Sequence, residues 1–126
     1  MTRQAFFTDK VVELSAPLSN AVRTGNLLFV SGITPYDLER KVTPGDFKAQ
    51  MRRVMESSKI IMEEAGTSLA RVVKATLMLV DIRHFQEAYE IYREYFDEPY
   101  PALTTLECGL ARSEFMVEVE FIAEID

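Results

Sequence analysis

The sequence has very few of the residues that build disulfides and metal sites. It contains one cysteine, Cys108, one histidine, His84, and no tryptophan. A single cysteine excludes an intrachain disulfide, and one histidine cannot by itself build a zinc site. No run approaches the roughly 18 apolar residues that a membrane span needs, and the first residues do not form a signal peptide. We therefore expect a cytoplasmic protein with no metal and no membrane partner.

Cofactor motifs and clustered positive charge are missing as well. The chain has no Gly-rich phosphate loop, no Cys-x-x-Cys pair and no His-Glu-x-x-His, so we expect no cofactor. Lys and Arg number 14 against 20 Asp and Glu, which gives a net charge of −6. Nucleic acid binds proteins that gather cations on one surface, so we expect no nucleic-acid partner. We expect His84 at the surface and Cys108 as a small core residue rather than a nucleophile.

The residues that are present describe an ordinary globular chain. Its 126 residues are 48% hydrophobic and 27% charged. That length can bury a sizeable core without disulfides, and no linker or repeat divides it. We therefore predict a single domain over residues 1–126.

Two helices are predicted from apolar residues at helical spacing. The first is expected to begin with Thr43 as N-cap and Pro44 in its first turn, and to end at Gly66 as a left-handed C-cap. The second is expected to follow Asp81 and to end before Pro99. The predicted buried positions are Phe47, Met51, Val54, Met55, Ser58, Met62 and Ala65 in the first helix, and Phe85, Ala88, Tyr89, Tyr92 and Phe96 in the second.

Strands are predicted at 21–24 and 26–33 as a hairpin, at 72–80, at 102–108 and at 114–125, with a weaker one at 4–7. The last alternates strictly, with Phe115, Val117, Val119, Phe121 and Ala123 on one side. Two helices can cover only one face of this α+β sheet. The other face is predicted to mix apolar and charged residues, which indicates a subunit interface. Its predicted members are Val72, Lys74, Thr76, Met78, Met116, Glu118, Glu120 and Ile122.

Three stretches together resemble the RidA family, also called YjgF, of small trimeric imine and enamine deaminases. They are 16–22 continued through 25–32, 64–69 running into 72–76, and 100–102 through 117–123. The resemblance implies a chorismate-mutase-like (RidA/YjgF-like) mixed sheet with two helices on one face. It further implies a homotrimer whose open sheet faces form a central barrel, with small-molecule clefts between neighbouring subunits.

The resemblance also implies where the site lies. Glu118 aligns with the family glutamate that holds the attacking water. The backbone N–H of Gly32 falls where the family offers a donor to the ligand, and the neighbouring Ser31 is expected to bind the ligand as well. Thr104 and Thr105 fall beside the cleft, where they can hydrogen-bond a polar ligand.

Four family positions carry a different residue in this chain. Leu103 replaces an arginine that binds the substrate carboxylate, and Leu18 replaces a tyrosine. Tyr89 stands where an asparagine is often found, and Arg112 where the family has a proline. Arg112 would then bring a guanidinium to another wall of the same cleft, while Leu18, Leu103 and Tyr89 are equally compatible with simple packing.

Three functions are compatible with these residues. The first is a metal-free hydrolytic imine or enamine deaminase with altered substrate choice, in which Glu118 is the base. The second is a trimer that binds or senses a metabolite without turnover. The third, the ribonuclease or translation-inhibitor role attached to the family, fits the negative net charge least well. A structural alternative for Glu118 is an ion pair with Lys74 on a neighbouring strand.

Overall fold

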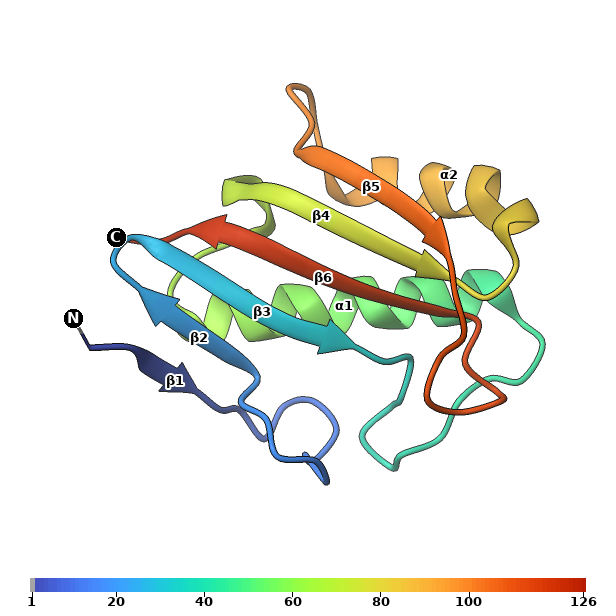
Figure 1. The fold of residues 1–126 in the computed structure, drawn as a ribbon, viewed down its shortest axis with the longest axis horizontal. Helices are drawn as coiled ribbons and strands as arrows, with labels where there is room; N and C mark the ends of the chain where they lie inside the picture. Colours follow the sequence, from blue (N-terminus) through green and yellow to red (C-terminus); the bar gives the residue numbers. More distant parts are fainter. Residues whose placement is uncertain (1) are drawn as a thin grey trace.

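The computed structural model describes residues 2–126 and arranges six strands and two α-helices as a curved sheet with helices packed behind it (Figure 1). Two short 3-10 helices, η1 and η2, precede β4 and α2. The elements in chain order are β1 (Gln4–Phe6), β2 (Ala21–Thr24), β3 (Leu27–Ile33), α1 (Phe47–Ala65), η1 (Leu69–Arg71), β4 (Val72–Leu79), η2 (Ile82–His84), α2 (Phe85–Tyr95), β5 (Ala102–Glu107) and β6 (Val117–Glu124).

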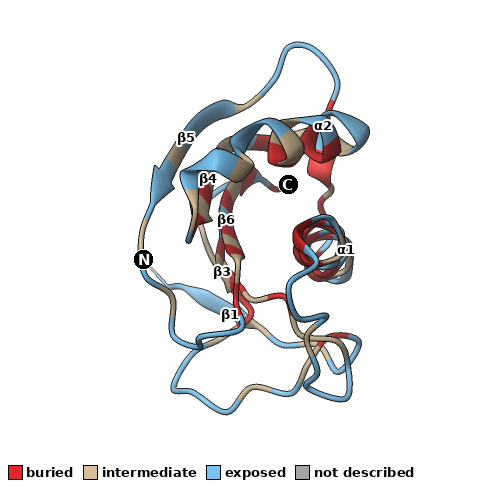
Figure 2. Cartoon of the chain, turned by 90° about the vertical axis from the view of Figure 1, so that its right-hand side faces the viewer, coloured by how far each residue is buried: buried red, intermediate tan, exposed pale blue. Residues whose placement is uncertain are grey.

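The sheet has the order β1-β2-β3-β6-β4-β5. All neighbouring strands run antiparallel except β4 and β5, which are parallel. Both α-helices lie on the same face of the sheet, and the other face is left uncovered by the chain (Figure 2). This architecture confirms the predicted chorismate-mutase-like mixed sheet. No helix in the described part of the chain is long and apolar enough to cross a membrane.

The core lies between the sheet and the two α-helices. The five alternating residues predicted from Phe115 to Ala123 are all buried, and all seven positions predicted for the inner side of α1 are buried too. Burying apolar side chains at the period of each element stabilises the fold, because it removes their surface from water. In α2 the buried positions are Ala88, Ile91 and Tyr92, whereas Phe85 is 40% exposed, so the predicted stripe was wrong at Phe85.

The start of α1 differs from the prediction. The N-cap is Asp46, not Thr43, and the helix begins at Phe47. The Asp46 carboxylate accepts a hydrogen bond from the Ala49 N–H at 3.0 Å, which satisfies one of the free amides of the first turn. Thr43 instead accepts from the Asp46 N–H through its backbone carbonyl. The predicted C-cap is confirmed, since Gly66 has φ 99°.

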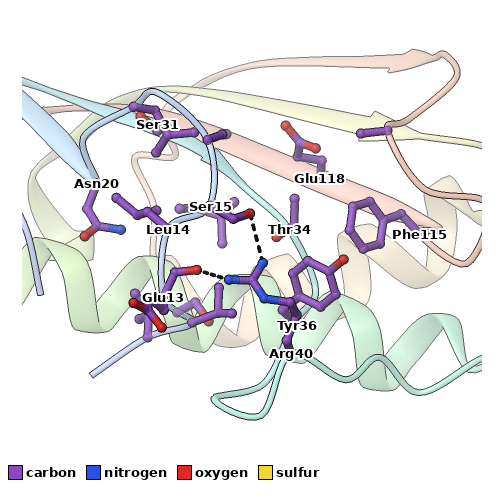
Figure 3. Close-up of a pocket in the computed structure, with 18 of the residues that line it drawn as sticks. Glu13, Leu14, Ser15, Asn20, Ser31, Thr34, Tyr36, Arg40, Phe115 and Glu118 are labelled. Atoms are coloured by element: carbon purple, nitrogen blue, oxygen red, sulfur yellow. Dashed lines mark hydrogen bonds between the residues drawn. The ribbon is translucent and has the colours of Figure 1, made fainter. Parts of the chain in front are cut away.

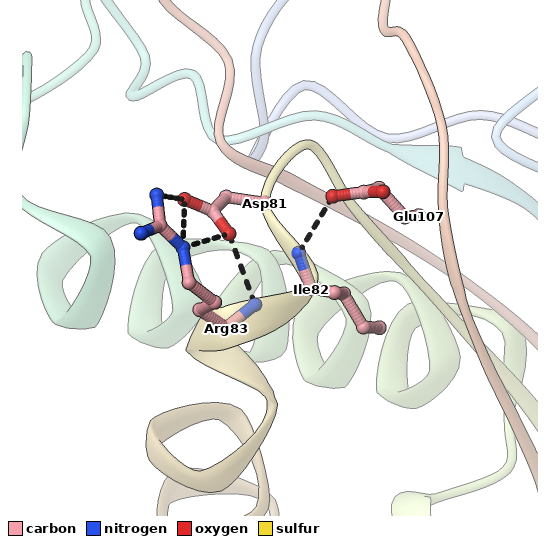
Figure 4. Close-up of polar contacts among 4 residues, drawn as sticks. All are labelled: Asp81, Ile82, Arg83 and Glu107. Atoms are coloured by element: carbon pink, nitrogen blue, oxygen red, sulfur yellow. Dashed lines mark hydrogen bonds and ion pairs between the residues drawn. The ribbon is translucent and has the colours of Figure 1, made fainter.

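Asp81 and Glu107 fix the turn that leads from β4 into α2. The Asp81 carboxylate accepts from the Arg83 backbone and guanidinium, and Glu107 accepts from the Ile82 N–H at 3.1 Å (Figure 4). The Arg83 guanidinium lowers the pKa of Asp81 to about 2. His84 closes this turn and is only half-exposed, because its ring stacks on Phe47 with centroids 4.5 Å apart. The prediction that His84 lies at the surface was therefore partly wrong.

Two other predicted positions are corrected. Val72 was expected on the uncovered face, but it is 8% exposed and belongs to the core. The pairing of β4 with β6 shifts between Val72 and Lys74, and this irregularity turns Val72 inward. Cys108 was expected in the core, but it follows β5 and is half-exposed, with its N–H donating to the Leu79 carbonyl.

Candidate functional site

A bulge in β3 prepares the candidate site. Val30 pairs with Phe121 and Ile33 pairs with Val119, so two residues of β3, Ser31 and Gly32, stand opposite one residue of β6. Val30 and Ile33 are both buried although they are three apart, which a regular strand does not allow. Such a bulge bends the strand and redirects its side chains. Ser31 and Gly32 are both left half-exposed by this bend.

Gly32 makes room for the carboxylate of Glu118. A Cβ built on Gly32 would overlap Glu118 Oε2 and would lie 3.2 Å from its Cδ. The Glu118 carboxylate of β6 therefore occupies the space that a side chain at position 32 of β3 would take. Ser31 fixes the neighbouring segment, since its hydroxyl donates to the Ser19 carbonyl at 2.6 Å and its N–H donates to that of Asn20.

A cavity of about 350 Å³ opens beside this carboxylate (Figure 3). Its walls come from the irregular segment before β2, the bulge of β3, the loop after β3, α1 through Ser57 and Ile61, the segment before β6, and β6 itself. Five of the predicted site residues line it, namely Leu18, Ser31, Gly32, Arg112 and Glu118. Arg112 is exposed, and no side-chain hydrogen bond or ion pair is recorded for it within residues 2–126.

Glu118 is a half-buried acid without a cationic partner in the described chain. Burial raises the pKa of its carboxyl, and the negative charge of Glu120 raises it further. The alternative of an ion pair between Glu118 and Lys74 is wrong. The Lys74 ammonium donates to Thr104 Oγ1 at 2.6 Å, and Lys74 lies opposite Ile122 in the strand register, not opposite Glu118. A carboxylate in this setting is suited to accept a proton from a bound water.

The other four predicted residues do not reach this cavity within one chain. Leu103, Thr104 and Thr105 lie on β5, which β4 separates from β6. The Tyr89 hydroxyl lies 2.9 Å from Thr105 Oγ1, so those two side chains meet on the helix side of the sheet. Leu103 is 36% exposed at the sheet edge. A single chain thus holds two separate groups of predicted site residues.

The cavity residues that the sequence did not mark as part of the site include Tyr36, Arg40 and Phe115. Tyr36 and Phe115 meet edge to face with ring centroids 5.0 Å apart, and the Arg40 guanidinium lies over the Tyr36 ring. The loop that carries Tyr36 and Arg40 has no periodic pattern, so only its aromatic and cationic residues could have marked it. Phe115 was predicted as core and is buried, yet it also forms part of the wall.

Gln50 holds the segment that leads into the acidic strand. It is 1% exposed on α1. Its amide nitrogen donates to the carbonyls of Thr43 and Glu114, and its amide oxygen accepts from the Met116 N–H at 2.8 Å. A buried amide with its donors and acceptor in use fixes backbone position well. Gln50 therefore sets the entry of β6, two residues before Glu118.

No metal-binding cluster accompanies these groups. Among residues 2–126, no three His, Cys, Asp or Glu side chains come together in a way that could hold a metal ion. The chemistry available from the cavity residues themselves is proton transfer by a carboxylate, charge pairing by Arg112, and apolar packing.

Comparison with known proteins agrees with this fold. Residues 8–125 match the family model described as endoribonuclease L-PSP. A RutC family protein from Pyrococcus abyssi is 40% identical over 124 residues, covering 98% of each chain.

Solved structures give the same result. RidA from an Antarctic Psychrobacter is 35% identical with a TM-score of 0.90, covering 97% of this chain and 99% of its own. TdcF from E. coli, solved with bound serine, is 26% identical with a TM-score of 0.88, covering 98% and 99%. The matches span almost the whole chain and include every wall of the cavity. The chain therefore belongs to the RidA/YjgF family, the family of the endoribonuclease L-PSP model.

Proposed function

We propose that this protein is a hydrolytic deaminase of small imines or enamines, with Glu118 as the base. The observation that carries the proposal is the half-buried Glu118 carboxylate, which faces a cavity of about 350 Å³ across a glycine. Its raised pKa makes it a better proton acceptor for a bound water than an exposed glutamate would be. The reaction consumes one water and releases a carbonyl compound and ammonia.

In the proposed mechanism Glu118 holds a water against the imine carbon. The water oxygen attacks the carbon of the protonated imine while the carboxylate takes up one water proton, which gives a carbinolamine. The carboxyl passes this proton to the nitrogen, and ammonia departs as the carboxylate takes up the proton of the carbinolamine hydroxyl and the carbonyl forms. Arg112 pairs with a negative group elsewhere on the ligand, because a guanidinium binds a carboxylate through two parallel hydrogen bonds. Leu18 makes the wall around Glu118 more apolar than a tyrosine would.

The proposal includes a homotrimer. The face of the sheet that the helices leave open exposes apolar side chains such as Phe29, which is 42% exposed and pairs in register with Ile122. Packing this face against other copies would remove these side chains from water. It would also allow the second group of predicted residues, on β5, to approach the cavity of a neighbouring chain.

A non-catalytic metabolite-binding trimer is the second candidate. It is favoured by Leu103 and Leu18, since neither leucine can hold a substrate carboxylate by charge or hydrogen bonding. TdcF, a structural relative, has been solved with bound serine, which supports an amino-acid-sized ligand for either function. We do not propose RNA cleavage, because the net charge is −6.

Ammonia release from freshly generated 2-iminopropionate separates the two candidates. Turnover that is lost in Glu118→Gln supports the deaminase. Turnover that is absent in the parent but appears in Leu103→Arg shows an intact site with another preferred substrate. Silence in both chains contradicts the deaminase and favours the binding protein, which calorimetry with L-serine would then test directly.

A further inference from the structure

Arg40 has an unusual backbone. Among residues 2–126 it is the one non-glycine residue recorded with positive φ, at 60°. Residues with a side chain rarely take this left-handed conformation, which persists where the surrounding structure fixes it. Asp37 provides that restraint, since its carboxylate accepts from the Glu39 and Lys41 N–H groups at 2.9 Å and its carbonyl accepts from the Arg40 N–H.

The Arg40 side chain reaches from this turn to another segment. Its guanidinium lies 5.3 Å from the centroid of the Tyr36 ring. It donates to Ser15 Oγ at 3.3 Å and to the carbonyl of Glu13 (Figure 3). One planar cation thus joins the loop after β3 to the stretch before β2, and both of these segments line the cavity.

The stretch from residue 11 to residue 18, here called the 11–18 segment, is a thin wall. It contains no helix or strand. It separates the site cavity of about 350 Å³ from a second hollow of about 620 Å³, and Val11, Leu14 and Leu18 line both. Within residues 2–126, two hydrogen bonds join residues 12–16 to another segment, and Arg40 donates both of them.

We propose that Arg40 is a positioning residue that holds the 11–18 segment in place and thereby restricts the site to small, amino-acid-sized imines. The restriction to small imines rests on the proposed function, whereas the restraint of the 11–18 segment by Arg40 rests on the geometry alone. When the two hydrogen bonds are present, the wall stays between the two hollows and the site keeps its small volume. When they are removed, the segment yields and the two spaces join around the same apolar lining.

Arg40→Gly is the sharpest test, because glycine accepts φ 60° and leaves the turn closed by Asp37 intact. Lys41→Ala is the matched control, since it removes the adjacent exposed cation and no recorded side-chain contact of the cavity. Limited proteolysis by thermolysin within residues 12–18 should be about tenfold faster in Arg40→Gly than in the parent or the control, because cleavage follows the population of the open segment, which rises by that order when charge-assisted hydrogen bonds are lost. Cleavage within β3 and β6 should stay unchanged.

Substrate selectivity gives the functional readout. The kcat/KM ratio for the imine made from L-phenylalanine over 2-iminopropionate should rise at least about fivefold in Arg40→Gly, mainly through KM. Arg40→Lys should restore part of the parent's selectivity, because an ammonium can still donate to one acceptor.

The outcomes distinguish this inference from the proposed function. If the parent hydrolyses neither imine, the proposed function fails, and the proteolysis experiment still decides whether Arg40 restrains the segment. If cleavage within residues 12–18 is equally fast in Arg40→Gly and Lys41→Ala, the restraint is overturned. If cleavage becomes faster but selectivity does not move, Arg40 has a structural role only and the specificity claim is overturned.

Discussion

Gly32 and Glu118 share one small space, because the carboxylate of Glu118 lies where a side chain on residue 32 would begin. The bulge in β3 brings the two together, and β6 provides the acid on its open face. The position of the proposed base therefore depends on the absence of a single methyl group on the neighbouring strand.

Gly32→Ala should move the carboxylate without unfolding the sheet. The new Cβ would meet the far end of a side chain, not backbone, so Glu118 would rotate away. We expect ammonia release to fall by on the order of 10²-fold, since a displacement of about 1 Å in a catalytic group has that effect. Gly109→Ala is the control, because a Cβ there meets nothing within 4 Å. Equal activity in the two variants would mean that Glu118 need not occupy this position.

Glu118→Gln should change how stability depends on pH. The raised pKa of Glu118 means that the folded state holds this proton more tightly than the unfolded state does. The stabilisation that the protonated Glu118 carboxyl gives the parent is therefore fully present below the ordinary pKa of a glutamate. It is lost as pH rises from there through the raised pKa of the folded state. The unfolding temperature of Glu118→Gln relative to the parent should accordingly increase as pH rises above the ordinary pKa of a glutamate.

Glu124→Gln is the control for this trend, because Glu124 is exposed on the same strand. Thermal unfolding followed by circular dichroism at each pH makes the comparison. A constant difference between Glu118→Gln and the parent would show that the folded and unfolded states hold the Glu118 proton equally.

Phe29→Asp should break the proposed assembly. A carboxylate on the open face of β3, beside Ile122, would be costly to bury against another copy. We expect the parent to sediment as a trimer and Phe29→Asp as a monomer. Phe7→Asp is a suitable control, since Phe7 is 67% exposed and follows β1 instead of lying within a strand. A parent that sediments as a monomer would contradict the assembly outright.

Asp46→Ala and Thr43→Ala together test which residue caps α1. Asp46→Ala removes the acceptor for the Ala49 N–H and should reduce the free energy of unfolding by about 1 kcal/mol. Thr43→Ala should change it by less than about 0.5 kcal/mol, because the recorded contacts of Thr43 use its backbone carbonyl. Urea denaturation measures both values, and a larger loss in Thr43→Ala would restore the cap expected from the sequence.

These caps illustrate how far the sequence reaches. The inner residues of α1 and the alternation from Phe115 to Ala123 were predictable, because each repeats at the period of its element. Thr43 and Asp46 are both good capping residues three positions apart, and only the position of the helix on the sheet decides between them. The mixed sheet with both helices on one face agreed with the family resemblance, which no single periodic pattern could supply.

The cavity was less predictable than the fold. Glu118, Gly32 and Leu18 were identified through the resemblance, but the bulge that joins Glu118 to Gly32 changes the pattern at two residues only. Arg40 belongs to a loop whose shape depends on Asp37 and on a segment 25 residues earlier in the chain. Such contacts between irregular segments leave no periodic trace, so they become visible only in three dimensions.

The place of β6 in the sheet has a consequence for biosynthesis. It is the last of the six strands along the chain, yet it lies between β3 and β4 and pairs with both. Until residues 117–124 have left the ribosome, the β1–β3 meander and the β4–β5 pair each present an unpaired inner edge. Neither edge of the nascent polypeptide can therefore be paired within the sheet until β6 is synthesised. During that interval the exposed edges of β3 and β4 can pair with another chain or be bound by a chaperone.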